Sequence, residues 1–204
     1  MTPSLDHIKD RARTCHLQVL GQSGVAVLLG PLEPNFWQEF TSSPEWQDGA
    51  PHPMDRWSER VISGLADEMG ATALFPFGPN QADFLGLALN STQTWQSPVG
   101  MLVHDQAGLM VSFRGALVFD QTLPETELAT KPCDACDRPC EMACPVQALT
   151  PPGYDGPKCK EYLATVAGKS CLTSGCLVRR ACPVSQKFGR APEQSGYHMR
   201  QFLG

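Results

Sequence analysis

The chain has 204 residues, of which 42% are hydrophobic, and its formal net charge is −5. This length allows one medium-sized domain or a larger domain with a small appendage, and the apolar fraction is high enough for a core, which argues against a disordered chain. No long run of Lys or Arg offsets the negative charge, so the composition argues against a general nucleic-acid or anionic-membrane binder.

The sequence contains no apolar run of about 18 residues, the minimum for a membrane span. Its first 20 residues also lack the basic and then apolar layout of a signal segment. We therefore expect a cytoplasmic protein without a membrane span. Structural disulfides are rare in that compartment, so clustered cysteines indicate metal or redox chemistry first.

The first part of the chain mixes helical and strand patterns. Residues 3–14 predict a short helix, and HLQVL and GVAVLLG (16–20 and 24–30) predict strands. HPMDRWSERVISGLADEMG (52–70) is the clearest helix, because Pro53 and Gly70 mark its ends and its apolar residues recur on one stripe. That stripe, in which Trp57 is expected to be core, consists of Met54, Trp57, Val61, Ile62, Leu65 and Met69.

Two further stretches predict strands. ATALFPFG (71–78) reads as a strand that runs into a turn, and Phe75 and Phe77 are either ordinary core or an aromatic wall for a flat cofactor. Residues 99–119 predict two strands around a turn at 105–108, with Leu109, Val111 and Phe113 alternating against Met110, Ser112 and Arg114. The order of elements predicts an α+β fold, in which residues 1–128 form a mainly antiparallel sheet with flanking helices.

The cysteines divide the chain. Only Cys15 precedes residue 133, and the other eight cysteines lie between residues 133 and 182. After the connector QTLPETELATKP (121–132), the pattern changes to turns and short helices. We expect a second domain, residues 129–204, that is organised by ligands rather than by an apolar core.

The motif KPCDACDRPCEMACP (131–145) indicates iron–sulfur chemistry. Its spacing is C-x2-C-x3-C-x3-C-P, one residue longer than the bacterial ferredoxin run C-x2-C-x2-C-x3-C-P, whose fourth cysteine binds the other cluster in two-cluster proteins. Soft thiolates suit iron in a sulfide cage. Downstream, Cys159 is followed by a looser set that ends in a second Cys-Pro pair, Cys171-x4-Cys176-x5-Cys182-Pro183.

The ferredoxin crossover rule predicts two [4Fe–4S] clusters and assigns their ligands. The eight clustered cysteines supply two four-ligand sets and leave only Cys15 over. The first set is Cys133, Cys136, Cys140 and Cys182, and the second is Cys144, Cys159, Cys171 and Cys176.

Three other interpretations of the cysteines stay open. Structural zinc is one, although zinc ribbons favour two separated C-x2-C pairs and this chain has one. A disulfide framework is another and would need an oxidising compartment. The third is a single cluster with the downstream cysteines merely packed, because the second set departs furthest from the ferredoxin run.

Residues 130–190 resemble the double-cluster segment of epoxyqueuosine reductases and corrinoid reductive dehalogenases. The resemblance rests on the first cysteine run, on an isolated cysteine before a helix (KCKEYLAT) and on a closing Cys-Pro. Those families close with C-x2-C-x3-C-P, so the second half of this chain's motif departs from theirs. The resemblance implies a ferredoxin-like, double-cluster C-terminal segment of short helices and turns.

Residues 97–119 (SPVGMLVHDQAGLMVSFRGALVF) also resemble the cobalamin-handling scaffold of those families and of the CblC-type cobalamin-processing chaperone. The matching positions are Gly100, His104, Gly108 and the pair Arg114-Gly115. Small bacterial ferredoxin-like proteins share the CPV at 182–184 and a His-Met-Arg near the C-terminus, here 198–200. The resemblance implies a cobalamin or flavin pocket beside the clusters, with His104 and Arg114 as candidate cofactor-binding residues and His198 as a residue that covers a cluster or caps the fold.

Three functions follow from these observations. The first is an electron-transfer protein with two [4Fe–4S] clusters and a partner redox protein. The second is a corrinoid- or flavin-dependent reductase that the clusters feed, and the third is an interaction module that metal only stabilises. No G-x-G-x-x-G, G-x4-G-K-[ST] or H-E-x-x-H motif is present, so the sequence offers no nicotinamide-binding, phosphate-loop or metalloprotease signature.

Overall fold

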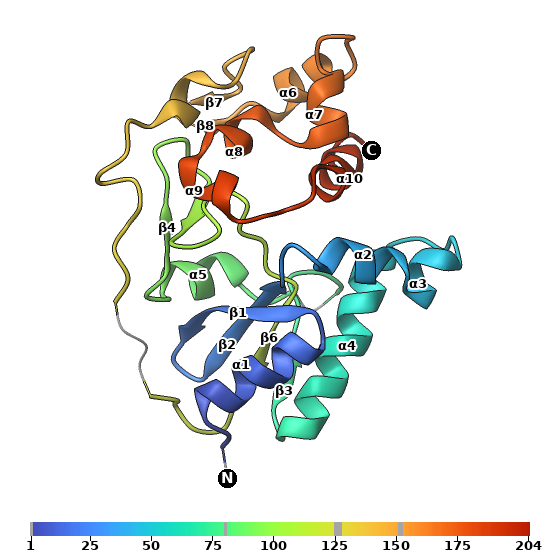
Figure 1. Ribbon diagram of the computed structural model, residues 1–204, viewed down its shortest axis with the longest axis vertical. Coiled ribbons are helices and arrows are strands. Elements are labelled where there is room, and N and C mark those ends of the chain that lie inside the picture. Colours follow the sequence, from blue (N-terminus) through green and yellow to red (C-terminus); the bar gives the residue numbers. More distant parts are fainter. Residues whose placement is uncertain (1, 80, 125–127, 151–152) are drawn as a thin grey trace. The chain divides into compact units, whose positions relative to one another are not determined.

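The computed structural model describes residues 2–79, 81–124, 128–150 and 153–204 (Figure 1). Its contacts divide the chain into two compact units. Unit 1 comprises Met1–Thr94 and Ser112–Ala129, and unit 2 comprises Trp95–Val111 and Thr130–Gly204. The sequence predicted a division after residue 128, whereas the structure also transfers Trp95–Val111 to the cysteine-containing unit. Residues 125–127 of the predicted connector lie outside the described residues.

Unit 1 contains a four-stranded antiparallel sheet with the order β1-β2-β6-β3. The strands are β1 (Leu17–Ser23), β2 (Ala26–Pro31), β3 (Thr72–Leu74) and β6 (Gly115–Val118). All six residues of the central strand β2 are buried, as expected for a strand with neighbours on both edges. The prediction of an α+β fold with an antiparallel sheet and flanking helices is therefore confirmed.

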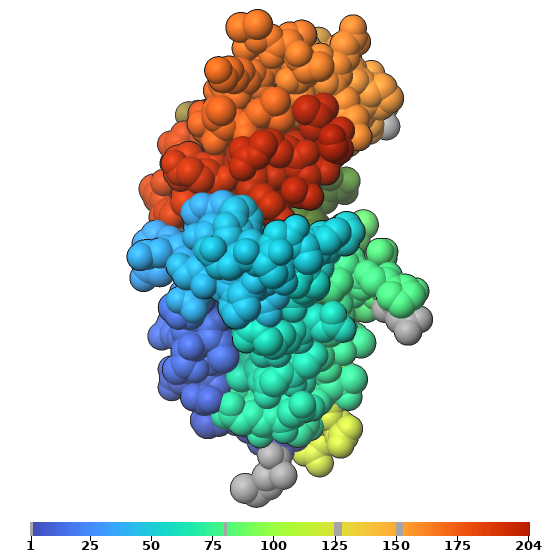
Figure 2. Space-filling model, turned by 90° about the vertical axis from the view of Figure 1, so that its right-hand side faces the viewer, coloured from blue at the N-terminus to red at the C-terminus, as the bar shows by residue number. Residues whose placement is uncertain are grey.

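Helices flank this sheet. They are α1 (Leu5–Thr14), α2 (Phe36–Thr41), α3 (Pro44–Gln47), α4 (Pro53–Met69) and α5 (Phe84–Leu89). Helix α4 confirms the prediction for residues 52–70 and ends at Gly70, whose φ of +63° is the left-handed conformation that glycine adopts readily. Trp57 on α4 is core, as predicted, and meets Phe36 edge-to-face at 5.2 Å. Figure 2 shows α1 to α4 in blue to teal.

Unit 2 consists of short elements. It contains β4 (Thr94–Gln96) paired with β5 (Leu102–His104), the 3-10 helix η1 (Pro139–Met142), and β7 (Leu149–Thr150) paired with β8 (Gly153–Tyr154). Five helices follow, of which α10 packs against α7. They are α6 (Gly156–Leu163), α7 (Lys169–Ser174), α8 (Leu177–Ala181), α9 (Pro183–Lys187) and α10 (Pro192–Leu203).

The prediction of two strands across residues 99–119 is only partly right. The first strand and its turn are present, but residues 109–114 are not a strand, and β5 and β6 belong to different sheets. The alternation from Leu109 onward does not mark two faces, because Leu109, Met110 and Val111 are all buried. These three residues are core of the cysteine-containing unit, which is why the chain leaves the extended conformation there.

Arg114 is tied to helix α4. Its Nε donates to Ser58 Oγ at 3.0 Å, its Nη2 donates to Asp55 Oδ1 at 2.5 Å, and its guanidinium lies 5.3 Å from the centre of the Phe77 ring. The Arg114 side chain is 11% exposed. Arg114 therefore connects the start of β6 to α4 inside unit 1. Within the described ranges, no helix is both long and apolar enough to cross a membrane.

We expect Asp55→Ala to lower the free energy of unfolding by about 2 kcal/mol, because it leaves the nearly buried Arg114 without its carboxylate. Asp48→Ala, which removes the partner of Arg56 in an exposed pair, serves as the control and should cost much less. Urea unfolding followed by tryptophan fluorescence reports on unit 1, since Trp37, Trp46 and Trp57 lie there. Equal losses in both variants would contradict this account.

Candidate metal centre

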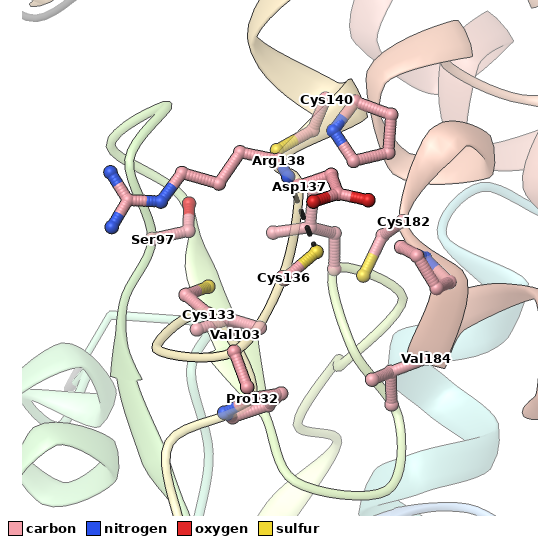
Figure 3. A pocket seen from close by; sticks show the side chains of 14 residues that line it. Ser97, Val103, Pro132, Cys133, Cys136, Asp137, Arg138, Cys140, Cys182 and Val184 are labelled. Carbon is pink, nitrogen blue, oxygen red and sulfur yellow. Dashed lines mark hydrogen bonds between the residues drawn. The ribbon is translucent and has the colours of Figure 1, made fainter.

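Four cysteines from separate parts of unit 2 line one open pocket of about 410 Å³ (Figure 3). Cys133 and Cys136 lie in the loop that leads into η1, Cys140 lies within η1, and Cys182 is the residue before α9. The remaining walls are the apolar side chains of Val103 on β5 and of Leu109, Val184 and nearby prolines, together with the polar residues Ser97, Asp137 and Arg138. The structure thus brings together the four cysteines that the sequence assigned to the first set.

Cys182 is held by backbone amides. Pro183 begins helix α9 and fixes the chain direction after Cys182. Burial alone would raise the pKa of the Cys182 thiol, but the backbone N–H groups of Ser185, Leu109 and Val184 beside its sulfur favour the charged form, and the pKa is lowered overall. Donors that favour the charged form prepare this sulfur to act as a thiolate ligand.

The other cysteines of the pocket have mixed surroundings. Burial raises the pKa of Cys133 and Cys140, and the nearby charge of Cys182 raises both further. The backbone N–H of Arg138 donates to Cys136 Sγ at 3.3 Å, and Arg138 itself has a left-handed backbone conformation (φ 54°). Thiols that share one pocket and repel as anions are stabilised together when a cation or a cationic cage binds them.

The four cysteines of the second set also lie in unit 2. Cys159 lies in α6, Cys171 in α7, Cys176 precedes α8, and Cys144 follows η1. Burial raises the pKa of the Cys159 thiol, a hydrogen bond from Tyr154 lowers it, and the charges of Cys176 and Cys144 raise it.

The pKa of the Cys171 thiol is affected by other cysteines of the same set. Burial raises its pKa, a backbone N–H at Leu177 lowers it, and the charges of Cys176 and Cys159 act on it in turn. Cys144 Sγ accepts the backbone N–H of Ala148 at 3.2 Å. The four thiols predicted as the second set therefore influence one another electrostatically. All nine cysteines, which lie in the described ranges, are free thiols, and Cys15 lies in unit 1 at the end of α1.

The described residues contain no group of three His, Cys, Asp or Glu side chains placed to hold a single metal ion. Thiolates around one tetrahedral zinc lie about 3.8 Å apart, because each Zn–S bond is about 2.3 Å long. A four-iron cage stands between its thiolates and requires a wider ring. The open pocket with four thiols on its wall suits a group of that width, and the ligand assignment itself stays a prediction.

His104 and Arg114 do not form one site. His104 is the last residue of β5 in unit 2, and Arg114 belongs to unit 1, where Asp55 and Ser58 hold it. The backbone N–H groups of Gln106 and Ala107 donate to His104 Nδ1 at 3.1 and 3.2 Å, and Asp105 Oδ1 lies 3.0 Å from the same nitrogen. His104 Nε2 is buried and makes no hydrogen bond within the part of the chain that the structure describes.

Three other residues named from the sequence pack against aromatic neighbours. The ring centres of Phe75 and Phe77 lie 5.1 Å apart, and the Arg114 guanidinium lies over the Phe77 ring. His198 lies on α10 with its ring 5.6 Å from that of Tyr197. The aromatic pair is thus part of unit 1, and His198 is part of unit 2.

Sequence reasoning did not identify Ser97, Leu109 and Arg179 as part of the site. Ser97 lines the pocket, and its buried hydroxyl has no hydrogen-bond partner among the described residues. Leu109 donates its N–H to Cys182, and its carbonyl accepts Arg179 Nη1. The only local signal for these residues was the glycine of the HDQAG turn, which predicts a chain reversal but does not predict which segment the turn contacts.

Comparison of the chain with family models, with curated proteins and with solved structures found no match. The resemblance to epoxyqueuosine reductases and corrinoid reductive dehalogenases therefore rests on the motifs of the sequence alone.

Gly108 sets how closely the 104–108 turn approaches Cys182. A Cβ at this position would lie 2.5 Å from the Ser185 backbone N and 3.0 Å from Cys182 Sγ, and φ is +57°. We expect Gly108→Ala to lower the thermal midpoint of unit 2 strongly. Gly100→Ala, also at positive φ (77°) but with nothing within 4 Å, is the matched control.

Hydrogen exchange of the amides in α9 and β5 measures the effect on unit 2 directly. The close approach predicts faster exchange in Gly108→Ala than in Gly100→Ala. Similar exchange in the two variants would show that backbone strain alone, and not contact with Cys182, makes position 108 a glycine.

Proposed function

We propose that this protein binds two [4Fe–4S] clusters through the eight cysteines of unit 2 and transfers electrons. The observation that carries this proposal is that the four cysteines predicted for the first cluster line one pocket, although Cys133 and Cys182 are 49 positions apart in the chain. Such a crossover is a feature of two-cluster ferredoxins. In this proposal the segment 129–204 is ferredoxin-like and the protein works in the cytoplasm with a redox partner protein.

Hydrogen bonds to sulfur support the proposal. Backbone N–H groups donate to Cys136, Cys144 and Cys182, and a further one acts on Cys171. Amide donors stabilise the negative charge of ligand sulfurs and are one of the means by which proteins set cluster potentials. Both predicted sets receive such donors.

The charge of unit 2 also supports it. Unit 2 carries ten Lys and Arg against seven Asp and Glu, a net charge of +3 with neutral thiols, whereas unit 1 carries six against fourteen, a net charge of −8. Eight thiolates would add strong negative charge to unit 2 even after the iron is counted. An excess of cations in that unit offsets this charge, which lowers the cost of holding the ligands deprotonated.

The residues of unit 2 would divide the work as follows. A bound [4Fe–4S] cluster supplies a one-electron carrier that alternates between its oxidised and its one-electron-reduced form. The eight thiolates would hold the iron, the amides would orient the sulfurs, and Val103 and Leu109 would form an apolar wall of the first site. The electron comes from a reduced one-electron donor and leaves to an oxidised acceptor, so no proton-transferring side chain is needed.

The proposal does not extend to a corrinoid- or flavin-dependent reaction or to a purely structural metal. Arg114, one of the two candidate cofactor residues, already binds Asp55 and Ser58, and His104 lies in the other unit. No observation on the described residues favours either alternative over electron transfer.

We expect anaerobically reconstituted protein to contain about eight iron and eight sulfide ions per chain and to show EPR signals of reduced [4Fe–4S] clusters after dithionite treatment. Each of two variants, Cys182→Ser and Cys176→Ser, should lose about half of the iron, because each removes one ligand from a different set. Cys15→Ser keeps the chain length and loses a thiol outside both sets, so it should retain all of the iron.

Three results would contradict the proposal. Zinc bound in place of iron and sulfide would indicate a structural site. Four irons in the wild-type protein, unaffected by Cys176→Ser, would indicate one cluster. Clusters that dithionite and a stronger low-potential reductant fail to reduce would indicate a purely structural role.

A further inference from the structure

Ser97 directly follows strand β4 and lines the pocket of the first cysteine set (Figure 3). Its backbone is used in the turn between β4 and β5, because its N–H donates to Met101 O at 2.8 Å and its carbonyl oxygen accepts from Gly100 N at 3.0 Å. Its side chain takes no part in that turn. The residue is 6% exposed, and its buried hydroxyl has no hydrogen-bond partner among the residues that the structure describes.

The other buried serines are arranged differently. Each of their hydroxyls makes a hydrogen bond inside the protein. They are Ser43, Ser58, Ser91, Ser185 and Ser195. A buried hydroxyl without a partner is costly, because it has lost its hydrogen bonds to water and gained none in return. The free hydroxyl of Ser97, placed on the wall of a pocket, therefore indicates an acceptor that is bound in that pocket.

The acceptors that gather around this pocket are sulfur atoms. Val99, two residues after Ser97, and Val103 on β5, the partner strand of β4, belong to one hydrophobic cluster together with cysteines of the pocket. These cysteines are Cys133, Cys140 and Cys182. The segment that carries Ser97 thus packs against the thiols of the first set. Thiolate ligands and the inorganic sulfides of a [4Fe–4S] cluster both accept hydrogen bonds.

We propose that the Ser97 hydroxyl donates a hydrogen bond to a sulfur atom of the first cluster and raises the reduction potential of that cluster. One-electron reduction makes the cluster more negative, so a donor to its sulfur stabilises the reduced form more than the oxidised form. Ser97 lines the first pocket, so the effect is specific to the first cluster. This inference rests on the proposed function, because its acceptor is a cluster sulfur.

Thr94 offers a matched control on the same strand. Its hydroxyl is also buried and unpartnered within the described ranges, but Thr94 does not line the pocket. Thr94→Val removes this hydroxyl and keeps a side chain of similar shape. An effect that arises from removing any buried hydroxyl of this strand would appear in Thr94→Val as well, whereas a hydrogen bond to the cluster is lost only in Ser97→Ala.

The test is a redox titration of the reconstituted full-length protein, followed by EPR. The Cys182→Ser and Cys176→Ser variants, each of which lacks one cluster, assign the two reductive transitions. We expect Ser97→Ala to lower the midpoint potential of the first cluster and to leave that of the second cluster unchanged. Thr94→Val should change neither potential. Ser97→Thr retains a hydroxyl and should keep the first potential at the wild-type value.

The outcomes separate this inference from the proposed function. Wild-type protein that binds no iron and sulfide overturns the proposed function itself. Full cluster content with an unchanged first potential in Ser97→Ala overturns the role of Ser97 alone, as does an equal shift in Thr94→Val. If Ser97→Ala does not retain the first cluster, Ser97→Thr decides: a retained cluster at the wild-type potential supports the hydroxyl donor, and a lost cluster or a lowered potential overturns it.

Discussion

The contact between the 104–108 turn and Cys182 is the constraint on which unit 2 depends. Gly108 allows the turn to lie against Ser185 and Cys182, and the next residue, Leu109, gives its N–H to the Cys182 sulfur. The Ser185 hydroxyl returns a hydrogen bond to Ala107 O at 3.5 Å. A segment that precedes the first cysteine of the motif by about two dozen residues thereby becomes part of the wall around it, and helix α9 is held in place.

The core of unit 2 around this contact contains few large apolar residues. Its core cluster consists of Val99, Val103, Leu109, Val178, Cys140 and Cys182, so one third of it is cysteine and half comes from the 95–111 segment. Buried thiols pack like small hydrophobic residues, but such a core is small for the length of chain it supports. Ligand bonds at the cysteines would supply the cross-links that this core lacks.

Local patterns in the sequence predicted much of unit 1 and little of how unit 2 is assembled. The amphipathic stripe and the Pro and Gly ends of α4 are local signals, and the structure reproduces that helix within a residue at each end. Residues 109–114 were wrongly predicted as a strand, because alternating apolar residues produce the same sequence pattern when they pack against a cysteine-containing loop as when they pack in a sheet. Leu109 packs with Cys140 and Cys182, which are distant in sequence, and hydrophobic periodicity cannot predict such distant contacts.

The cysteine sets could be proposed from spacing because a known crossover rule connects positions that are far apart. No such rule connects Leu109 to a sulfur, since a backbone amide carries no residue signature. The residues closest to the sulfurs after the ligands themselves were therefore visible only in three dimensions.

The same side chain has two different uses in the two units, and the neighbouring anion decides which. Arg60 and Arg114 in unit 1 meet Glu45 and Asp55, and the pKa of the Glu45 carboxyl is lowered mainly by its hydrogen bond to Arg60. These pairs are complete without any ligand. The guanidinium of Arg179 in unit 2 instead donates to the backbone oxygen of Leu109. An arginine can therefore stabilise a fold through a carboxylate, as in unit 1, or through a backbone oxygen, as Arg179 does in unit 2.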